Sequence, residues 1–128
     1  MAQILLFNVA PEKRRKLLVL SLRLGAVCRE VPPEDFGRPL AVLTGRAEAS
    51  AGEPEAAPFS EEMLVLDGLR DDQLSALLAG LRRERATVAL KAVVTEHNLD
   101  WTPAKLVREL AAEHAALHGG GTSVHGAG

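Results

Sequence analysis

Hydrophobic positions follow two different periods between Val88 and Leu117. From Val88 to Thr95 they alternate, which places the apolar side chains on one face of an extended segment. From Pro103 to Leu117 they recur every three or four residues and form one stripe of a helix. Thr102 supplies a hydroxyl cap for that helix, and proline suits the first helical position because its missing N–H is not needed there. The stretch therefore predicts a strand, a polar turn and a helix.

Similar patterns run along the rest of the chain. Gly25 follows an apolar helical stripe and is suited to end that helix in the left-handed conformation. Asp71 or Asp72 is suited to cap a later helix. The predicted strands are Ile4–Phe7, Ala26–Val31, Met63–Leu66 and Val88–Thr95, and the predicted helices are Pro11–Leu24, Asp72–Arg85 and Pro103–Leu117, with a weakly helical segment at Glu34–Leu43.

Both halves of the chain show the order strand, helix, strand, helical segment. This order favours an α+β fold, a ferredoxin-like split βαβ sandwich with added helices, in which the first and third strands are central. Those two strands are wholly apolar, whereas the proposed edge strands carry Arg29, Glu30 and Lys91. A small doubly wound α/β sheet is the alternative, because alternating strands and helices also allow it.

The domain organisation follows from composition. Residues 1–117 are expected to form a single domain, with a mobile loop at 44–58, where residues are small, polar and proline-containing. The glycine-rich tail 118–128 is expected to be disordered. Two helices cover one face of the predicted sheet, so the other face needs either the added segments or a second subunit. A homodimer is therefore predicted.

Charge and cysteine content narrow the classes of partner and compartment. The net charge is −2 over 128 residues, so no global positive field draws nucleic acid or an acidic membrane. The single cysteine, Cys28, is compatible with a reducing cytoplasm. Residues 13–28 resemble a secretory signal, but Arg23 interrupts the apolar run after six residues. We expect a cytoplasmic protein that binds neither nucleic acid nor membrane.

Several motifs of the second half resemble a known family. They are MLVLDGL (63–69), the helix from Asp72 to Arg85, LKAVVT (90–95), Asn98, Trp101 and the ending EL-x-x-EH (109–114). Together they are similar to a bacterial domain-of-unknown-function family, number thirty-seven eighty-three. In the first half, ILLFNV, PEDF (33–36) and PLAVLTG (39–45) also look like longer members of that family. The resemblance implies a fold but no activity, because the family has no assigned catalytic or binding residues.

Four basic residues, Lys13, Arg14, Arg15 and Lys16, crowd the start of the first helix. They are candidates for a small-anion site, since helix N-terminal N–H groups and basic side chains can converge on a phosphate or carboxylate. The preceding loop is not glycine-rich, so it is not a phosphate cradle of a known type. A solvated charged face is the favoured interpretation.

The most polar turn joins the strand at Val88 to the helix at Pro103. Thr95, His97, Asn98 and Trp101 lie there, where the carboxyl end of a strand meets a helix N-terminus and a ligand can bind. The same residue types also stabilise turns and fill cores. We favour this structural interpretation and keep the four residues as ligand-binding candidates.

Lys91 interrupts an apolar strand and is the last binding candidate, either as a buried amine with a lowered pKa or as a side chain that reaches solvent from an edge strand. No Ser-His-Asp, Cys-His or paired-carboxylate pattern accompanies it, so no catalytic residue is assigned. His114 and His118 stand at i,i+4, but two ligands do not make a metal site. The sequence predicts neither a metal nor a cofactor.

These observations favour a non-enzymatic regulatory or protein-interaction module. We expect a homodimer, with a small anionic ligand or a partner protein as further options. The competing hypothesis is an enzyme or a metal-binding protein whose site has no recognised pattern. RNA binding is disfavoured because the central strands carry aliphatic residues where an RNA-binding sheet needs exposed aromatic and basic ones.

Overall fold

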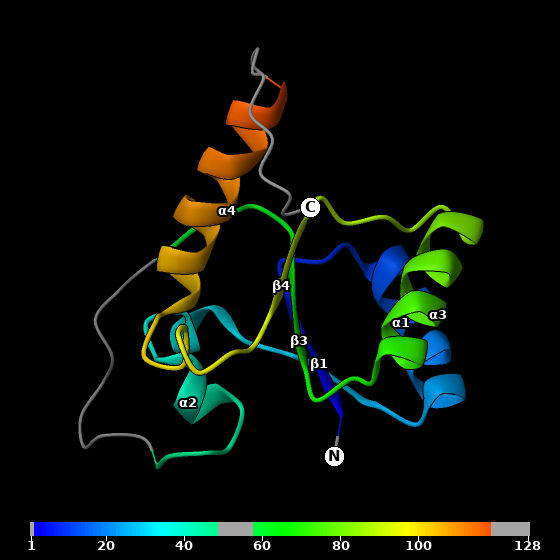
Figure 1. The fold of residues 1–128 in the computed structure, drawn as a ribbon, viewed down its shortest axis with the longest axis horizontal. Helices are drawn as coiled ribbons and strands as arrows, with labels where there is room; N and C mark the ends of the chain where they lie inside the picture. Colours follow the sequence, from blue (N-terminus) through cyan, green and yellow to red (C-terminus); the bar gives the residue numbers. More distant parts are fainter. Residues whose placement is uncertain (1, 49–57, 119–128) are drawn as a thin grey trace.

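The computed structural model of the chain describes residues 2–48 and 58–118, with side chains as far as Glu113. Four strands form one sheet with helices on both of its faces (Figure 1). The elements in chain order are β1 (Gln3–Phe7), α1 (Pro11–Leu24), β2 (Val27–Glu30), η1 (Pro33–Asp35), α2 (Leu40–Leu43), β3 (Met63–Asp67), α3 (Asp71–Arg83), β4 (Leu90–Val93) and α4 (Pro103–His118).

The sheet has the strand order β2-β1-β3-β4. The two central strands, β1 and β3, are antiparallel, with Leu5 opposite Val65. Each edge strand is parallel to the central strand of its own half: β2 pairs with β1 and β4 pairs with β3. The molecule therefore consists of two βαβ units joined along their first strands.

This topology confirms the predicted α+β class and the central and edge positions of the strands. One detail differs from a split βαβ arrangement: each edge strand lies directly beside its own central strand, so neither unit is split by a strand of the other. The antiparallel pair in the centre also makes the sheet mixed, unlike a purely parallel doubly wound sheet.

Helices α1 and α3 cover the same face of the sheet. A right-handed crossover is nearly universal for βαβ units, and two such units that run antiparallel place their helices on one side. Leu17 of α1 and Leu77 of α3 are fully buried there against Ile4 and Leu64. Gly80 allows the two helices to approach, because a Cβ built on it would lie 2.7 Å from a methyl carbon of Leu20.

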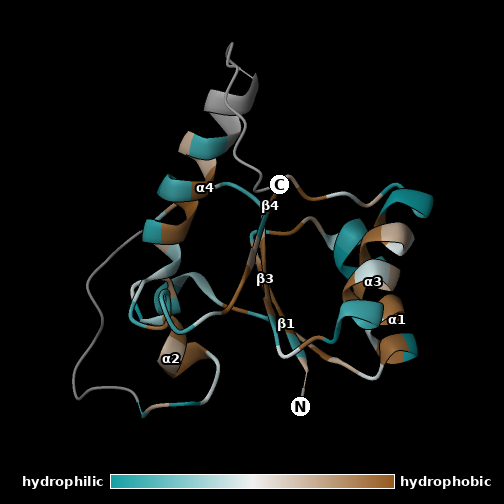
Figure 2. Cartoon of the chain, viewed as in Figure 1, coloured by the Kyte–Doolittle hydropathy of each residue, from teal (hydrophilic) through white to brown (hydrophobic). Residues whose placement is uncertain are grey.

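The opposite face is covered by α2 and α4 of the same chain (Figure 2), together with Val31 and Phe36. Phe7, Phe36 and Phe59 form an aromatic cluster there, and the rings of Phe36 and Phe59 stack with centroids 4.4 Å apart. The prediction that added helical segments cover this face is confirmed. A second subunit is not needed for that purpose, so the homodimer loses its original argument and stays a prediction.

Several local predictions can be compared with the structure. Gly25 has φ +76° and donates its N–H to the carbonyls of Ser21 and Leu22, as expected for the residue that ends α1. The prediction that Asp71 or Asp72 caps α3 is wrong, because both lie in its first turn. Residue Arg70 precedes the helix, and its backbone N–H donates to Oε1 of Gln73 at 2.8 Å.

The last strand and the predicted loop also differ in detail from the sequence predictions. Val88 precedes β4 and packs in the α1–α3 core, whereas Leu90 and Ala92 pack on the opposite face, so the predicted common face begins only at Leu90. In the predicted mobile loop, residues 44–47 are held by hydrogen bonds to α2. Residues 49–57 and the predicted disordered tail at 119–128 lie outside the described part of the chain.

Candidate functional site

The first two basic residues of the predicted anion site point away from one another. Nζ of Lys13 lies 2.6 Å from Oε1 of Glu62, just before β3. Arg14 forms an ion pair with Glu30 at the end of β2. Each charge is compensated by a carboxylate of the same chain, and the two pairs tie α1 to different strands. Lys13 and Arg14 therefore tie α1 to the sheet, and anion binding by these two residues stays a prediction.

The other two basic residues lie beside α3. Nζ of Lys16 donates to the backbone carbonyl oxygen of Glu84 at 2.8 Å, where the C-terminal end of α3 favours a positive charge. Arg15 and Lys16 line a shallow crevice between α1 and the end of α3. Two of the four predicted residues thus meet, at a place that the sequence pattern did not indicate.

The turn after β4 is held by its own polar groups. Oδ1 of Asn98 accepts the N–H of Thr95 at 2.9 Å, and Nδ2 of Asn98 donates to the carbonyl oxygen of Val93 at 3.0 Å. The N–H of His97 donates to Oγ1 of Thr95 at 3.2 Å, and the N–H of Trp101 donates to the carbonyl of Asn98 at 3.0 Å. These bonds account for the residue types at Thr95 and Asn98, whose side chains stabilise the turn, whereas His97 and Trp101 contribute only backbone N–H groups to them.

Trp101 also has a structural role beside this turn. Its ring packs against the α2–α4 core, and Nζ of Lys105 lies 4.3 Å from the ring centroid. The carbonyl oxygens of Leu99 and Trp101 accept the N–H groups of Ala41 and Leu40 at 2.8 and 2.9 Å. These two N–H groups open α2 and would otherwise lack helical partners. The turn therefore anchors α2 on the sheet.

Lys91 lies half-buried on the edge strand β4. Its Nζ donates to the carbonyl oxygen of Val88 at 2.5 Å, and burial lowers its pKa. A lowered pKa is what a nucleophilic or proton-transferring lysine needs, but such a residue also needs a second reacting group beside it. The bond to a backbone carbonyl supports the view that Lys91 reaches along its own strand toward the surface.

A buried polar cluster escaped the sequence interpretation. Asp67, at the end of β3, is only 5% exposed. Its carboxylate accepts two hydrogen bonds from Arg46, at 2.7 and 3.0 Å, and one from Nε2 of Gln3 at 2.8 Å. The Arg46 bonds hold the pKa of Asp67 below its ordinary value, and Gln3 adds to that effect. The carboxylate that directly follows the apolar run MLVL was the available signal, because a charge in such a place requires a partner.

The remaining candidate chemistry is limited within the described residues. Burial raises the pKa of the half-buried Cys28 thiol, so its thiolate is scarce at neutral pH. In residues 2–48 and 58–118, no three His, Cys, Asp or Glu side chains gather as metal ligands would. The side chains of His114 and His118 lie outside that described set.

The outer surface of α1 carries an apolar strip. Leu18, Val19 and Leu22 are 44%, 49% and 80% exposed, although each is a large aliphatic residue on a helix. Their positions, i, i+1 and i+4, place them on the side of α1 that faces away from the sheet. We call Leu18, Val19 and Leu22 the apolar strip. A contiguous exposed apolar surface of this kind marks a contact site more often than an isolated exposed leucine does.

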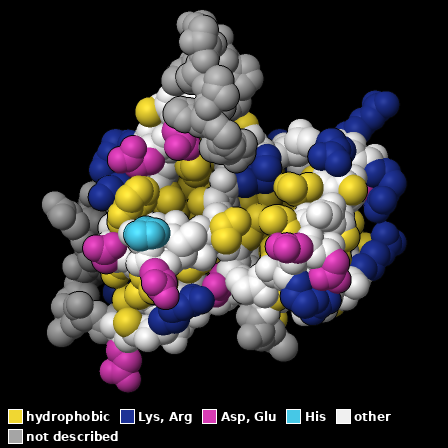
Figure 3. Space-filling model, in the orientation of Figure 1, with side chains coloured by type: hydrophobic (Ala, Val, Ile, Leu, Met, Phe, Trp, Pro, Cys, Tyr) yellow, Lys and Arg dark blue, Asp and Glu magenta, His cyan; other side chains and the backbone are white. Residues whose placement is uncertain are grey.

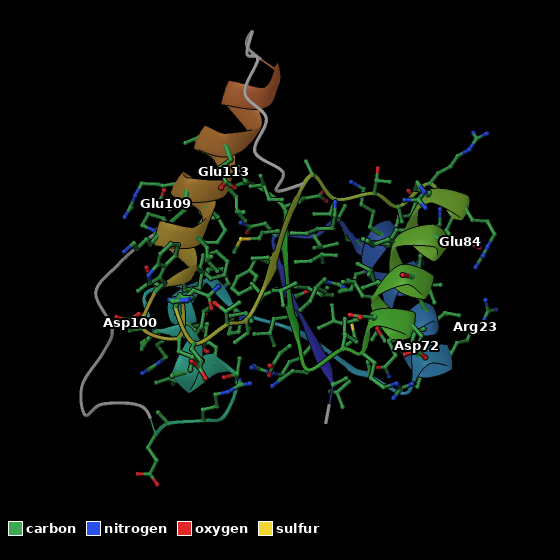
Figure 4. All side chains as sticks on the ribbon, in the orientation of Figure 1. Arg23, Asp72, Glu84, Asp100, Glu109 and Glu113 are labelled. Carbon is green, nitrogen blue, oxygen red and sulfur yellow. The ribbon has the colours of Figure 1, made fainter. Side chains whose placement is uncertain are left out.

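The crevice borders this strip. It has a volume of about 210 Å³ and is lined by Val19 and Leu20 together with charged groups. The charged lining residues are Arg15, Lys16, Arg23 and Glu84. Figure 4 places Arg23 and Glu84 on the α1–α3 side of the sheet, and Figure 3 shows Lys and Arg side chains gathered over the same side. The strip and the crevice together form an amphipathic surface with a basic rim.

Comparison with known proteins bears on the second βαβ unit. Residues 62–117 match the model of a family described as a domain of unknown function (DUF3783). This match confirms the resemblance noted for the second half, while the likeness of the first half stays a prediction. No curated protein and no solved structure matches the chain. None of the helices in the described residues has the length and apolarity required to cross a membrane.

Proposed function

Since the family model that residues 62–117 match describes a domain of unknown function, we propose a function from the geometry of the chain itself. We propose that the protein is a non-enzymatic interaction module. Its binding surface is the apolar strip of α1 with the adjoining crevice. Regulation would follow from occupation of that surface by a partner protein.

The observation that carries this proposal is the exposure of Leu22. At 80% it is the most exposed large aliphatic residue of the described chain, and Leu18 lies one helical turn before it. Neither residue is needed to cover the sheet, since Leu17 and Leu20 of the same helix already do so. Apolar side chains in water cost about 25 cal/mol for each Å² that a partner could cover. Association through this strip would recover that free energy.

The hydrogen bonds made by the polar candidate residues also support a non-enzymatic role. The side chains of Thr95 and Asn98 bond backbone groups within their own turn, and Lys91 bonds a nearby carbonyl. A catalytic site requires titratable groups that converge on one reacting position. These groups are occupied by local structure instead. An enzyme or a metal-binding protein remains the competing hypothesis, and turnover of a substrate by the purified protein would establish it.

The test is native mass spectrometry of the protein isolated gently from its producing cells, because it reports subunit number and retained partners together. The wild-type chain is compared with a Val19→Ser/Leu22→Ser variant. Val93→Ser is the matched control, since Val93 is 49% exposed, like Val19, but lies on β4. We expect a complex of defined stoichiometry for the wild-type and control proteins, and a bare monomer for the double variant.

The composition of the complex then distinguishes the partners. A mass of twice the chain would support the predicted homodimer, whereas an additional polypeptide would support a partner protein. Complexes that survive unchanged in the double variant would show that the apolar strip is not the binding surface. A wild-type protein that is itself a bare monomer at all accessible concentrations would contradict the proposal.

A further inference from the structure

Charge is unevenly divided between the two segments that border the crevice and the rest of the chain. Residues 11–24 contain five Lys or Arg and one Glu, a net charge of +4, and residues 82–85 contain three Arg and one Glu, a net charge of +2. These two segments therefore carry +6. The whole chain carries −2, so the remainder carries −8. The apolar strip thus lies on a helix of net positive charge in a chain that is acidic overall.

Part of this positive charge is already compensated, and part of it surrounds the crevice. Lys13 and Arg14 are paired with Glu62 and Glu30, on the sheet side of α1. Arg15, Lys16 and Arg23 instead line the crevice. The basic rim of the crevice thus comes from α1. On α3, the guanidinium of Arg83 lies 3.6 Å from the position of a Cβ built on Gly80, where α3 contacts Leu20.

From this geometry we propose that the partner docks an acidic amphipathic helix on α1, with one apolar side chain in the crevice between α1 and α3. The proposal rests on the interaction function stated above and specifies the chemistry of the partner. Glutamate or aspartate residues that flank the apolar face of the docked helix would pair with Arg15, Lys16 and Arg23. Helix-in-groove binding of this kind uses apolar anchors at helical spacing and a charged border.

The size of the crevice favours a side chain over a small ligand. Pockets for small molecules span about 300–1,000 Å³, and this crevice measures about 210 Å³. Its aliphatic lining, from Val19 and Leu20, suits the end of a leucine, isoleucine or methionine side chain. A buried apolar anchor surrounded by polar contacts is the usual form of a binding hot spot.

Other macromolecules fit this surface less well. RNA recognition relies on exposed aromatic rings for base stacking, but Phe7, Phe36, Phe59 and Trp101 all pack on the opposite face of the sheet. A membrane surface would contact protruding side chains and leave a concave crevice unfilled. A second copy joined by a twofold axis through α1 would bring two basic rims together, which costs free energy.

The experiment uses two fluorescent peptides of equal length, held helical by a hydrocarbon staple. Both carry the same leucine stripe, but one has Glu and the other has Lys at every flanking position. Fluorescence anisotropy is measured with the full-length protein over a series of salt concentrations. We expect the Glu peptide to bind at least tenfold more tightly than the Lys peptide, and its affinity to fall as salt is raised.

Variants locate the effect on the crevice. Arg15→Glu/Arg23→Glu is expected to reverse the preference, and Arg15→Gln/Arg23→Gln to abolish it. Arg70→Glu/Arg108→Glu, which makes the same change in net charge on exposed residues away from the crevice, is the matched control and is expected to keep it. Thermal unfolding of each variant verifies that the chain is folded.

Three results would overturn the inference. They are equal affinity for the two peptides, the same reversal in the Arg70/Arg108 control, and binding of phosphatidylglycerol vesicles in competition with the Glu peptide. In another outcome, neither peptide binds, yet native mass spectrometry shows a partner that is lost on Val19→Ser/Leu22→Ser substitution. This result would leave the interaction function intact and show that the partner is not an acidic helix. Failure of the interaction function itself would appear instead as a wild-type monomer in native mass spectrometry.

Discussion

Helices α1 and α3 occupy equivalent places in the two βαβ units, yet their outer surfaces differ. Each packs a fully buried leucine, Leu17 or Leu77, on the same face of the sheet. On α3 the residues that face solvent are charged or small, and they are Asp71, Asp72, Ser75, Ala76, Ala79, Arg82 and Arg83. On α1 the exposed positions include Leu18, Val19 and Leu22.

This difference separates the apolar residues that the fold requires from those that it does not require. The sheet requires one buried apolar stripe from each helix. Helix α3 shows that the outer face of such a helix can be polar. The apolar strip of α1 is therefore not explained by the fold. A contact with a partner would explain it, which is the reason for proposing the binding surface on α1.

The units also differ in what they bury at the strand ends. In the first unit β1 ends at Phe7, which is fully buried in an aromatic cluster. In the second unit β3 ends at the buried carboxylate of Asp67, held by Arg46 and Gln3. At this place the first unit thus buries an aromatic ring, and the second unit buries a charge whose partners come from β1 and from the segment after α2.

The largest expected effect tests the equivalence of the two helices. Leu17→Ala and Leu77→Ala should each lower the free energy of unfolding by about 2–5 kcal/mol, because both side chains are fully buried and leave a cavity. Urea denaturation measures both. If one variant were nearly as stable as the wild-type protein, the two helices would not contribute equally to one core. Leu22→Ala is the control and should change stability by no more than about 0.5 kcal/mol.

The next effect concerns the buried charge of the second unit. Asp67→Asn should lower the free energy of unfolding at pH 7 by about 1–3 kcal/mol, since the amide cannot accept all the bonds from Arg46 and Gln3. The pKa of Asp67 is lowered in the folded state. Its contribution is therefore complete above the unfolded pKa of about 3.9 and is lost as the pH falls through the folded pKa.

Unfolding measured at pH 7 and below pH 4 checks this prediction. The gap between the wild-type protein and Asp67→Asn should narrow on acidification. Asp72→Asn is the matched control, because Asp72 also pairs with an arginine, Arg70, but both side chains are exposed. A control variant that lost as much stability as Asp67→Asn would show that burial of the pair is unimportant.

The smallest expected change in stability tests the outer surfaces directly. Leu18→Ser/Val19→Ala/Leu22→Ser gives α1 the kind of outer face that α3 has. It should alter the free energy of unfolding by about 0.5 kcal/mol or less per site and should abolish binding of the Glu peptide. The converse variant, Ser75→Leu/Ala79→Leu, should add apolar surface to α3 without raising affinity for the peptide. A gain of binding there would show that any exposed apolar face suffices.

The fold could be predicted from sequence largely because its signals are local. The apolar runs at Ile4–Phe7 and Met63–Leu66 predicted the two central strands, and Gly25 predicted the end of α1. The strand order within the βαβ units could not be obtained in this way, because split and unsplit units have the same sequence of elements. Pairing partners are chosen by contacts between residues far apart in the chain.

The candidate site was predicted less well, for a related reason. Lys13 to Lys16 are adjacent in the sequence, but a helix turns successive side chains by about 100°, so their partners lie on different elements. Arg23 and Glu84 joined Arg15 and Lys16 only because α3 packs beside α1. The role of Asn98 and Trp101 in their turn was foreseen, since bonds within a turn depend on nearby residues alone.

The sequence by itself determined the element types, the apolar faces and the stabilising residues of the turns, because each of these depends on neighbours within a few positions. Only the tertiary structure decided that Leu18, Val19 and Leu22 face solvent while Leu17 and Leu20 are covered. All five residues belong to one apolar run of the same helix. Whether each is buried depends on where the sheet and α3 lie, and that placement is fixed by packing of the whole chain.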